Sequence, residues 1–470
     1  MGSNPTPSAT SLSFIHYSIT RLDGETTSPV KEAVDDMTVA EPVTRPASYH
    51  IWTIGCQMNK ADSDRLESAL IQLGLKPVPT PSDADVIVLN SCVVRQSAED
   101  KVIGMLTTLK AVKQGKGDCI VALMGCMVGP KTDDLQARFP HVDAFMRPQD
   151  YKPLLDILGD RLDVDVEGCL STLTPPNAVV TAYVPIIHGC DKFCTFCIIP
   201  YRRGRERSRT MEEIVEEAEL LAARGIKEIT LLGQNVDSYG RDLLDSSDLA
   251  DLLEAVSGVG GLSRVRFLTS HPNDMSQRII DAVASLDKVC EHFNVPFQAG
   301  DDQVLQVMRR GYSNDEYRRL VERIRETVPN VSLATDLIVG FPGESEAAFQ
   351  RSMEMLEDVR FDKVHVAAYS TRPGTIAARK LEDDVPHEEK KRRLKAVEQL
   401  QEAVVTHINA GLKGTVAEVL VEGREKGRWK GRNRNDKLIF LEDDRDLQGR
   451  TINVRIEKTS PWWLQGVAVS

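Results

Sequence analysis

No segment of the sequence holds the roughly 18 uninterrupted apolar residues that a membrane-spanning helix requires, so no such helix is expected. The first 47 residues also lack a cationic start followed by an apolar core, which argues against a secretory signal. They are rich in Ser, Thr and Pro and contain several acidic residues, which argues against an organelle transit peptide. We therefore expect a cytoplasmic protein in which residues 1–47 form a disordered tail.

The composition offers little support for a disulfide framework or for general binding to nucleic acid. Nine cysteines in 470 residues are few for a disulfide scaffold, and the cytoplasm keeps thiols reduced. Clustered cysteines are therefore better interpreted as metal or cluster ligands, and scattered ones as buried thiols. The net charge of −12 means that any RNA contact requires a local basic patch.

Residues 48–166 alternate short apolar runs with amphipathic segments. The runs are His50–Ile54, Asp85–Leu89 and Ile120–Met124, and helical patterns such as Lys60–Leu73 follow them. This βαβ rhythm predicts an α/β domain with an open, mostly parallel sheet. Residues 167–178, with two prolines and several hydroxyl residues, are expected to form a linker.

The same rhythm resumes over residues 179–410, where six apolar runs alternate with helical patterns. The runs are Tyr183–Ile187, Glu228–Leu232, Arg264–Leu268, Phe293–Phe297, Leu333–Val339 and Lys363–Tyr369. Six strand–helix units predict a partial (β/α)6 barrel, whose lateral opening would suit a large substrate. Residues 411–470 contain several short β-strand patterns, which predict a small C-terminal β-barrel.

Three cysteines lie within eight residues directly after the first barrel strand: Cys190, Cys194 and Cys197. Three thiolates can hold three irons of a [4Fe–4S] cluster, which normally takes four. The remaining iron could then bind S-adenosylmethionine (SAM), and electron transfer into its sulfonium would release a radical. The alternative is structural zinc, which requires four ligands, and no fourth Cys or suitably spaced His follows. This loop predicts the catalytic centre of a radical SAM enzyme.

Three further cysteines each follow one strand of the N-terminal sheet: Cys56, Cys92 and Cys126. The loops after parallel strands gather at one edge of the sheet, so these thiols can converge as ligands of a second cluster. The alternative is three unrelated buried thiols. Cys119 and Cys290 precede their strands and Cys169 lies in the linker, so we interpret these three as incidental.

Two polar segments follow later barrel strands and are candidates for cofactor binding. Gly233, Gln234 and Asn235 follow the second strand, and Gly340, Gly343 and Glu344 follow the fifth. Glycine lets backbone approach a ligand closely, and Glu344 could accept a hydrogen bond from a ribose hydroxyl or an amine. Glycines are also common turn residues, so residue type alone is weak evidence. The argument for cofactor binding is that these segments are expected at the same edge of the barrel as Cys190.

Two basic stretches are candidates for contact with RNA. Five arginines crowd residues 202–209, directly after the cysteine loop, where they could meet phosphates. A second stretch surrounds Trp429, which could stack on a base. Its candidate RNA-binding residues are Arg424, Lys426, Arg428, Lys430, Arg432 and Arg434, followed by Lys437. The alternative is a hairpin that is basic only for solubility.

With these residues in view, the sequence resembles the radical SAM methylthiotransferases, and most closely the MiaB-type tRNA enzymes. The resemblance covers residues 49–470 and rests on several motifs. They are GCQMN at 55–59, NSCVVR at 90–95, GC at 125–126, GCDKFCTFCIIPYRRGRERSR at 189–209, LLGQNVDSYG at 231–240, TSHP at 269–272 and IVGFPGE at 338–344. The C-terminal segment resembles a TRAM RNA-binding domain.

The resemblance implies a sulfur-containing-group transferase that inserts a methylthio group at C2 of N6-isopentenyladenosine 37 in tRNA. One SAM donates the methyl group, and another provides the radical that abstracts hydrogen from the adenine. It implies two [4Fe–4S] clusters, each with three Cys ligands: Cys190, Cys194 and Cys197 hold the radical-generating cluster, and Cys56, Cys92 and Cys126 an auxiliary one. The expected partners are tRNA, a flavodoxin- or ferredoxin-like electron donor and a sulfur source, but neither membrane nor DNA, and a monomer is expected.

Three alternatives stay open. Sister groups of the family modify N6-threonylcarbamoyladenosine or an aspartate of a ribosomal protein. A reading from another class is a redox-sensing iron–sulfur protein that binds RNA without catalysis. Gly233–Asn235 and the segment 336–344 argue against the sensor, since a sensor needs no cofactor residues around the strand ends.

Overall fold

A computed structural model of the chain describes residues 46–93, 96–164, 166, 176 and 178–469. The tail expected over residues 1–47 and the linker expected over 167–178 fall almost wholly outside this described part. In the residues that are described, no helix has the length and apolar character needed to cross a membrane.

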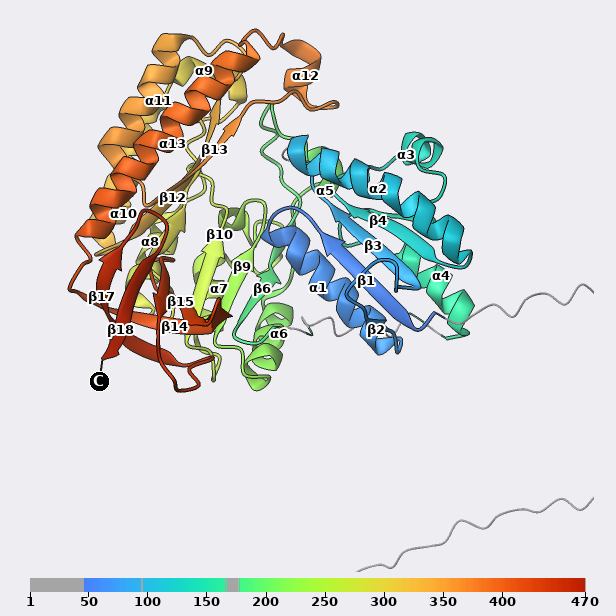
Figure 1. The fold of residues 1–470 in the computed structure, drawn as a ribbon. Helices are drawn as coiled ribbons and strands as arrows, with labels where there is room; N and C mark the ends of the chain where they lie inside the picture. The colour runs from blue at the N-terminus through green and yellow to red at the C-terminus, as the bar shows by residue number, and fades with distance from the viewer. Residues whose placement is uncertain (1–45, 94–95, 165, 167–175, 177, 470) are drawn as a thin grey trace, which may run out of the picture. The chain divides into compact units, whose positions relative to one another are not determined.

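The described part of residues 46–166 forms a five-stranded parallel sheet in the order β2-β1-β3-β4-β5, with helices on both faces (Figure 1). The strands are β1 (Ser48–Thr53), β2 (Lys76–Pro77), β3 (Val86–Ser91), β4 (Ile120–Gly125) and β5 (Ala144–Met146). The helices are α1 (Gln57–Gln72), α2 (Gln96–Lys116), α3 (Asp133–Arg138) and α4 (Lys152–Leu162). The predicted open sheet is confirmed.

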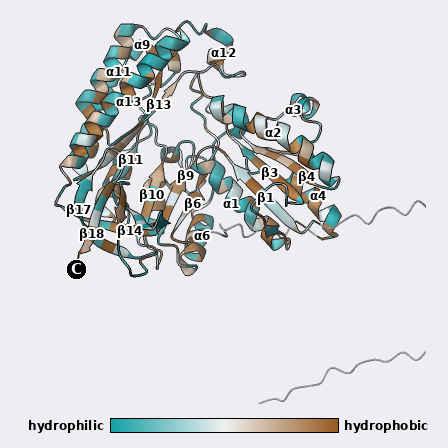
Figure 2. Cartoon of the chain, viewed as in Figure 1, coloured by the Kyte–Doolittle hydropathy of each residue, from teal (hydrophilic) through white to brown (hydrophobic). Residues whose placement is uncertain are grey.

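The central strands β3 and β4 are buried along their whole length, which explains their continuous apolar runs (Figure 2). One side of the sheet packs against α1 and α4, through residues such as Leu70 and Leu155. The other side packs against α2, through residues such as Leu106, and against Phe139, which directly follows α3. With both faces covered, the loops at the sheet's carboxyl edge are left to carry function.

Residues 178–469 are described without a gap, and their first part forms a six-stranded partial barrel. The strands are β6 (Thr181–Pro185), β9 (Glu228–Leu232), β10 (Arg264–Leu268), β11 (His292–Asn294), β12 (Ser332–Val339) and β13 (Lys363–Ala368). They form two parallel three-stranded sheets, β10-β9-β6 and β11-β12-β13. Backbone hydrogen bonds from Val265 to Lys288 and from Cys290 to Val265 join the two sheets. The predicted partial barrel is confirmed.

Helices follow the barrel strands and supply most of one large apolar core. They are α5 (Ile199–Arg203), α6 (Met211–Ala223), α7 (Leu249–Ser257), α8 (Gln277–Ser285), α9 (Asp302–Met308), α10 (Asn314–Thr327), α11 (Glu346–Val359), α12 (Ile376–Lys380) and α13 (His387–Ala410). A short antiparallel pair, β7 (Ile187–His188) with β8 (Arg207–Ser208), brackets the cysteine loop. The side chains of Thr210, Asp248 and Ser313 cap α6, α7 and α10.

The C-terminal segment closes into a five-stranded barrel, as predicted. Its strands are β14 (Val416–Glu425), β15 (Arg428–Asn433), β16 (Leu438–Leu441), β17 (Thr451–Thr459) and β18 (Leu464–Val469). β14 and β15 form a hairpin whose two loop residues, Lys426 and Gly427, both have positive φ, +50° and +83°. This turn type matches the twist of the strands, and a glycine accommodates it without strain.

Polar contacts attach this small barrel to the amino ends of the partial barrel's strands. Arg264, at the start of β10, donates to the Arg432 carbonyl at 2.7 Å and pairs with Glu418 at 2.8 Å. Arg434 pairs with Glu291, just before β11, at 2.7 Å. The small barrel therefore docks at the end of the partial barrel opposite to its carboxyl edge.

Candidate functional site: two groups of cysteines

Cys56, Cys92 and Cys126 come together at the carboxyl edge of the N-terminal sheet. They follow β1, β3 and β4, and a Cβ added at Gly55 would lie 2.8 Å from the Cβ of Cys92. The Cys126 amide donates to the Ser91 carbonyl at 2.9 Å. Burial raises the pKa of the Cys126 thiol, Arg203 nearby lowers it, and Cys56 raises it further. The predicted convergence is thus a feature of this structure.

A buried amide network fixes the position of these loops. Asn59 donates from Nδ2 to the side chain of Asn90 at 2.9 Å and to the Ser91 carbonyl at 3.0 Å. Asn90 in turn donates to the Asn59 carbonyl at 2.7 Å. Both amides are fully buried, and the Cys56 thiol donates to Asn59 Oδ1 at 3.3 Å. The asparagines of the GCQMN and NSC motifs therefore hold two cysteine loops in register.

The second group, Cys190, Cys194 and Cys197, lies on the loop between β7 and α5. Burial raises the pKa of Cys190 and of Cys197 to about 12, and the neighbouring Cys194 adds to both shifts. The Cys197 amide donates to the Cys194 carbonyl at 3.0 Å, which forms a tight turn. At Gly189, φ is +74° and a Cβ would lie 2.0 Å from the Arg205 carbonyl oxygen, so only glycine fits there.

A buried arginine donates a hydrogen bond to one cysteine sulfur of this loop. Arg310 donates from Nη1 to the Cys194 sulfur at 3.3 Å and from Nη2 to the Pro296 carbonyl at 3.2 Å. Its side chain is held by Tyr312, whose hydroxyl accepts from Nε at 3.2 Å. Arg310 lies more than a hundred residues from the cysteines and has no motif of its own, so it could not be predicted from the sequence.

An ion pair connects the two cysteine groups. Arg203, at the end of α5, pairs with Asp62 of α1 at 2.9 Å, and both side chains are almost fully buried. The same guanidinium lies near Cys126 and Cys56, while its Nη1 has no partner among the described residues. Arg203 was predicted to meet phosphates, and that prediction is wrong because the side chain is buried and paired.

The loops after β9 and β10 attach to the barrel cysteine loop through one carboxylate. Asp274 accepts from Lys192 and from Asn235, each at 2.6 Å, and from Arg241 at 2.8 Å. Lys192 lies inside the cysteine loop itself, between Cys190 and Cys194. Sequence reasoning missed both Lys192 and Asp274, although the lysine's position inside the loop was a usable signal.

Several buried polar atoms at the carboxyl edge of the partial barrel have no hydrogen-bond partner in the described part of the chain. They are Gln234 Oε1 and Asn235 Oδ1 after β9, His271 Nε2 after β10, Gln298 Oε1 after β11 and Glu344 Oε1 after β12. Buried polar groups are normally satisfied, so this group of unpaired atoms is a candidate site for a polar ligand. Gln234, Asn235 and Glu344 were predicted to bind cofactor.

The remaining predicted cofactor residues shape the same edge. A Cβ at Gly233 would lie 2.5 Å from the Ile187 side chain, and one at Gly340, where φ is +69°, would lie 2.4 Å from Lys390 Cγ. The Gly343 amide donates to Asp384 at 2.8 Å. The other oxygen of Glu344 accepts from Arg393 at 2.7 Å, so only Oε1 is left for a ligand.

These donor sets fit iron–sulfur clusters and SAM. Each cysteine group supplies three sulfurs from loops in contact, beside a buried cation, and a bound metal would deprotonate the thiols that bind it. Among the described residues, no group of three or more His, Cys, Asp or Glu side chains is placed to hold a single metal ion. A cubane differs from a single ion because each thiolate binds its own iron.

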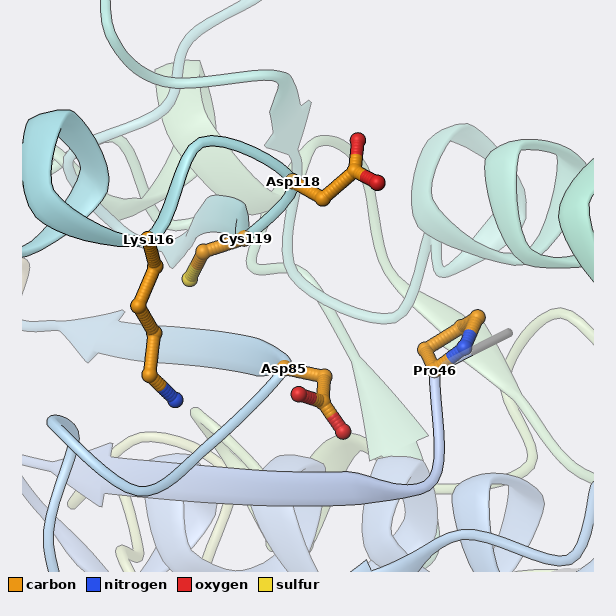
Figure 3. Close-up of a pocket in the computed structure, with 5 residues that line it drawn as sticks. All are labelled: Pro46, Asp85, Lys116, Asp118 and Cys119. Carbon is orange, nitrogen blue, oxygen red and sulfur yellow. The ribbon is translucent and has the colours of Figure 1, made fainter. Parts of the chain in front are cut away.

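A small cavity of about 210 Å³ lies away from this edge (Figure 3). It is lined by Pro46, Asp85, Lys116, Asp118 and Cys119, at the amino ends of β3 and β4. Burial raises the pKa of the Cys119 thiol, which makes it a poor nucleophile. The interpretation of Cys119 as incidental is consistent with this position.

The structure corrects two predictions in the basic C-terminal stretch. Trp429 is 5% exposed and belongs to the core of the small barrel, so it cannot stack on a base. Arg434 is paired with Glu291 and donates to the carbonyls of Asp287 and Val289, so it attaches the small barrel rather than facing outward. Strand alternation along β15 continues through Gly431, and places Trp429 inside and the neighbouring cations outside.

Three family models match consecutive parts of the chain. The Radical SAM superfamily matches residues 184–356, the uncharacterized protein family UPF0004 matches residues 48–147 and the TRAM domain matches residues 412–469. A radical SAM methyltransferase, TsrM, from Kitasatospora setae shares the fold with a TM-score of 0.53 at 13% identity, covering 70% of this chain and 74% of that one. Fold, cysteine loop and family models define a radical SAM enzyme with a C-terminal TRAM domain.

Relatives that match nearly the whole chain show which family within this class it belongs to. The chain is 50% identical over 425 residues to a tRNA-2-methylthio-N(6)-dimethylallyladenosine synthase of Herpetosiphon aurantiacus, covering 89% of this chain and 96% of that protein. A synthase of the same name from Dehalococcoides mccartyi is 49% identical over 422 residues, covering 90% and 98%. The chain belongs to the family of MiaB-type radical SAM methylthiotransferases.

Proposed function

We propose that this protein transfers a methylthio group to C2 of N6-dimethylallyladenosine, the isopentenyl-modified adenosine beside the anticodon of tRNA. The relatives that cover about nine tenths of this chain at about half identity carry the name of that activity. A purine C–H bond is neither acidic nor electrophilic, so its replacement by sulfur needs radical chemistry rather than a positioned acid or base.

One structural observation supports the proposal more than any other. The buried ion pair between Arg203 and Asp62 joins the helix after the barrel cysteines to the helix after Cys56. Both cysteine groups therefore border the same short helix, α5, and Arg203 lies near Cys126. A methylthio transfer needs its radical source and its sulfur source close to one substrate atom, and this arrangement supports that proposal.

Each group supplies a set of ligands in the mechanism that we propose. Cys190, Cys194 and Cys197 would hold a [4Fe–4S] cluster, and Cys56, Cys92 and Cys126 a second one. When bound, the first cluster supplies the electron that cleaves SAM, and the second presents sulfur. The unpaired atoms of Gln234, Asn235 and Glu344 would bind the polar groups of SAM.

The chain's own residues position these groups. Lys192, paired with Asp274, holds the barrel cysteine loop against the loops after β9 and β10. Arg310 offers a fixed positive charge to the sulfur of Cys194. Burial of Cys92, Cys126 and Cys194 helps to exclude water, which would otherwise quench a reactive species. We further propose a cytoplasmic monomer with a flavodoxin- or ferredoxin-like electron donor and a separate sulfur source.

The proposal is tested by presenting alternative substrates to the purified, reconstituted protein under reducing conditions. With tRNA that carries N6-dimethylallyladenosine, we expect 5′-deoxyadenosine and the 2-methylthio nucleoside to form together. Methylthiolation of N6-threonylcarbamoyladenosine or of a ribosomal-protein aspartate instead would contradict the substrate. Absence of 5′-deoxyadenosine with every substrate would favour the non-catalytic redox sensor.

A further inference from the structure

Two buried polar atoms at the carboxyl edge of the partial barrel have no role in the proposed contacts to SAM. Those contacts use Gln234, Asn235 and Glu344, and they leave His271 Nε2, after β10, and Gln298 Oε1, after β11. His271 is 4% exposed and Gln298 is 9% exposed, and neither of these two atoms has a partner in the described part of the chain. Buried polar atoms without partners indicate a ligand that offers them hydrogen bonds.

His271 presents an uncharged N–H group in a fixed orientation. The Asn273 amide donates to His271 Nδ1 at 3.3 Å, so the neutral ring carries its proton on Nε2. Burial lowers the pKa of His271 to about 2, with Arg310 adding to the shift and Asp274 opposing it. The ring meets Tyr312 edge to face at a centroid distance of 6.0 Å, which fixes its plane. At neutral pH the imidazole is therefore a hydrogen-bond donor without charge.

The backbone beside Gln298 is bonded to the same tyrosine. Tyr312, which packs on the imidazole, donates from its hydroxyl to the Phe297 carbonyl at 2.8 Å. Gln298 itself has a φ of +67°, which is uncommon for a residue other than glycine. Its amide donates to the Asp336 carbonyl at 2.9 Å, which holds this conformation. A strained backbone that its surroundings hold in place is typical of a functional position.

The cations around the imidazole are already engaged, which disfavours an anionic ligand. Lys192 and Arg241 both pair with Asp274, at 2.6 and 2.8 Å. Arg310 donates to the Cys194 sulfur at 3.3 Å. Carboxylates and phosphates make their strongest hydrogen bonds with charged donors. A neutral N–H group together with a neutral amide oxygen is better suited to an uncharged ligand that has an acceptor next to a donor.

An adenine base offers that combination on one edge. Its ring nitrogen N1 accepts a hydrogen bond, and the amine on the neighbouring carbon donates one. Enzymes that modify a base commonly recognise it by this edge. An N6-alkylated adenine keeps one N–H on the amine, so both groups remain. N1 is also bonded to C2, the carbon at which the proposed reaction takes place. A donor that binds N1 therefore fixes the reacting carbon, which is one bond away.

We propose that His271 and Gln298 bind the adenine that is modified, with His271 Nε2 donating to N1 and Gln298 Oε1 accepting from the N6–H group. This inference rests on the proposed function and adds the residues that hold the substrate base. His271 orients C2 and transfers no proton. The segment TSHP at 269–272, which the proposed contacts to SAM do not use, thereby receives a role.

The test measures equilibrium binding of an anticodon stem-loop to the reconstituted protein without reductant, so that no turnover occurs. The stem-loops carry N6-dimethylallyladenosine, its 1-deaza analogue, in which C–H replaces N1, or its 7-deaza analogue, which keeps N1. His271→Leu removes the donor and His271→Gln keeps one. His407→Leu, at an exposed histidine of α13, is the matched control. The affinity for SAM and the thermal unfolding of each variant are measured on the same samples.

We expect the 1-deaza analogue to bind the wild-type protein roughly 5- to 100-fold more weakly than the parent stem-loop, because it leaves a buried N–H group unpaired. The 7-deaza analogue should bind like the parent. In His271→Leu the 1-deaza penalty should vanish while the affinity for SAM is unchanged, and His271→Gln should keep part of the penalty. Gln298→Met should weaken binding of the parent stem-loop and retain the 1-deaza penalty, because it removes the other hydrogen bond.

Four outcomes would overturn the inference. The first is a wild-type protein that binds the 1-deaza analogue as tightly as the parent, and the second is a penalty that persists in His271→Leu. Sensitivity to the 7-deaza analogue alone would mean that the base presents its other edge. A loss of SAM affinity in His271→Leu, with stem-loop binding unchanged, would assign the imidazole to SAM. Failure of the wild-type protein to bind the N6-dimethylallyladenosine stem-loop at all would instead contradict the proposed function.

Discussion

Arg310 donates a hydrogen bond of 3.3 Å to the sulfur of Cys194 from a side chain that is only 5% exposed. A buried cation at a cluster ligand stabilises the more negative, reduced state of the cluster. If the barrel cysteines hold the cluster that we propose, Arg310 is placed to adjust how readily SAM is reduced.

We predict that Arg310→Met lowers the reduction potential of the reconstituted barrel cluster. For a one-electron couple 59 mV corresponds to a tenfold change, and we expect a decrease on the order of 50 mV. The measurement is a redox titration followed by electron paramagnetic resonance, with Cys56, Cys92 and Cys126 replaced so that one cluster remains. Arg310→Lys keeps the charge and should shift the potential less. An unchanged potential in Arg310→Met would show that the hydrogen bond has no influence on the cluster.

We predict a large loss of local stability when only one partner of the Arg203–Asp62 ion pair is removed. Arg203→Met leaves Asp62 buried without its counter-charge, which typically costs about 3–5 kcal/mol. Hydrogen exchange of the α1 amides reports this loss directly, without requiring the whole chain to unfold in one step. The double variant Arg203→Met with Asp62→Leu should recover much of the protection. Additive losses in the double variant would contradict a direct pair.

We predict that the buried carboxyl of Asp237 makes the free energy of unfolding depend on pH. Burial raises the pKa of this carboxyl to about 7, although hydrogen bonds from Ser270 and His271 lower it and Asp274 raises it further. Between pH 4 and 7 the native state therefore holds a proton that the unfolded chain releases. Stability contributed by this group falls as pH rises through that window, by no more than about 4 kcal/mol.

Thermal unfolding of the apo-protein between pH 5 and 8 measures this effect. Asp237→Asn keeps the shape and removes the titration, so the variant should lose part of the downward slope and gain stability at pH 8. The same slope in the variant and the wild type would mean that another group is responsible.

Variants of Trp429 test whether this residue stabilises the small barrel or binds RNA. Because its ring fills the core of the small barrel and its Nε1 donates to the Asp443 carbonyl at 2.9 Å, Trp429→Ala should destabilise that barrel by about 3–5 kcal/mol. Trp429→Phe should cost much less and leave tRNA affinity unchanged. A fully folded Trp429→Phe that loses tRNA binding would restore the original prediction for this residue.

The sequence predicted the elements well where periodicity was strong. The runs at Glu228–Leu232 and Arg264–Leu268 coincide with β9 and β10. The convergence of Cys56, Cys92 and Cys126 followed from a rule of parallel sheets, that loops after strands share an edge. Such rules act through topology, so they need no side-chain detail.

What sequence could not predict were contacts between distant segments. Arg203 and Arg434 each carried a plausible role in binding phosphate, but their carboxylate partners, Asp62 and Glu291, lie more than a hundred residues away. Trp429 was predicted to stack on a base, but strand alternation along β15 places its ring in the core of the small barrel. That alternation continues although the facing strand β14 has a bulge between Val421 and Gly423. The roles of the cysteines themselves stay predictions.

The most direct test of the central claim is mass spectrometry of tRNA nucleosides from cells with and without this gene, complemented by wild type, Cys190→Ala or Cys126→Ala. The account predicts that 2-methylthio-N6-dimethylallyladenosine disappears without the gene while its unthiolated precursor accumulates, and that only wild type restores it. Unchanged 2-methylthio-N6-dimethylallyladenosine in the deletion, or full rescue by either cysteine variant, would contradict the account.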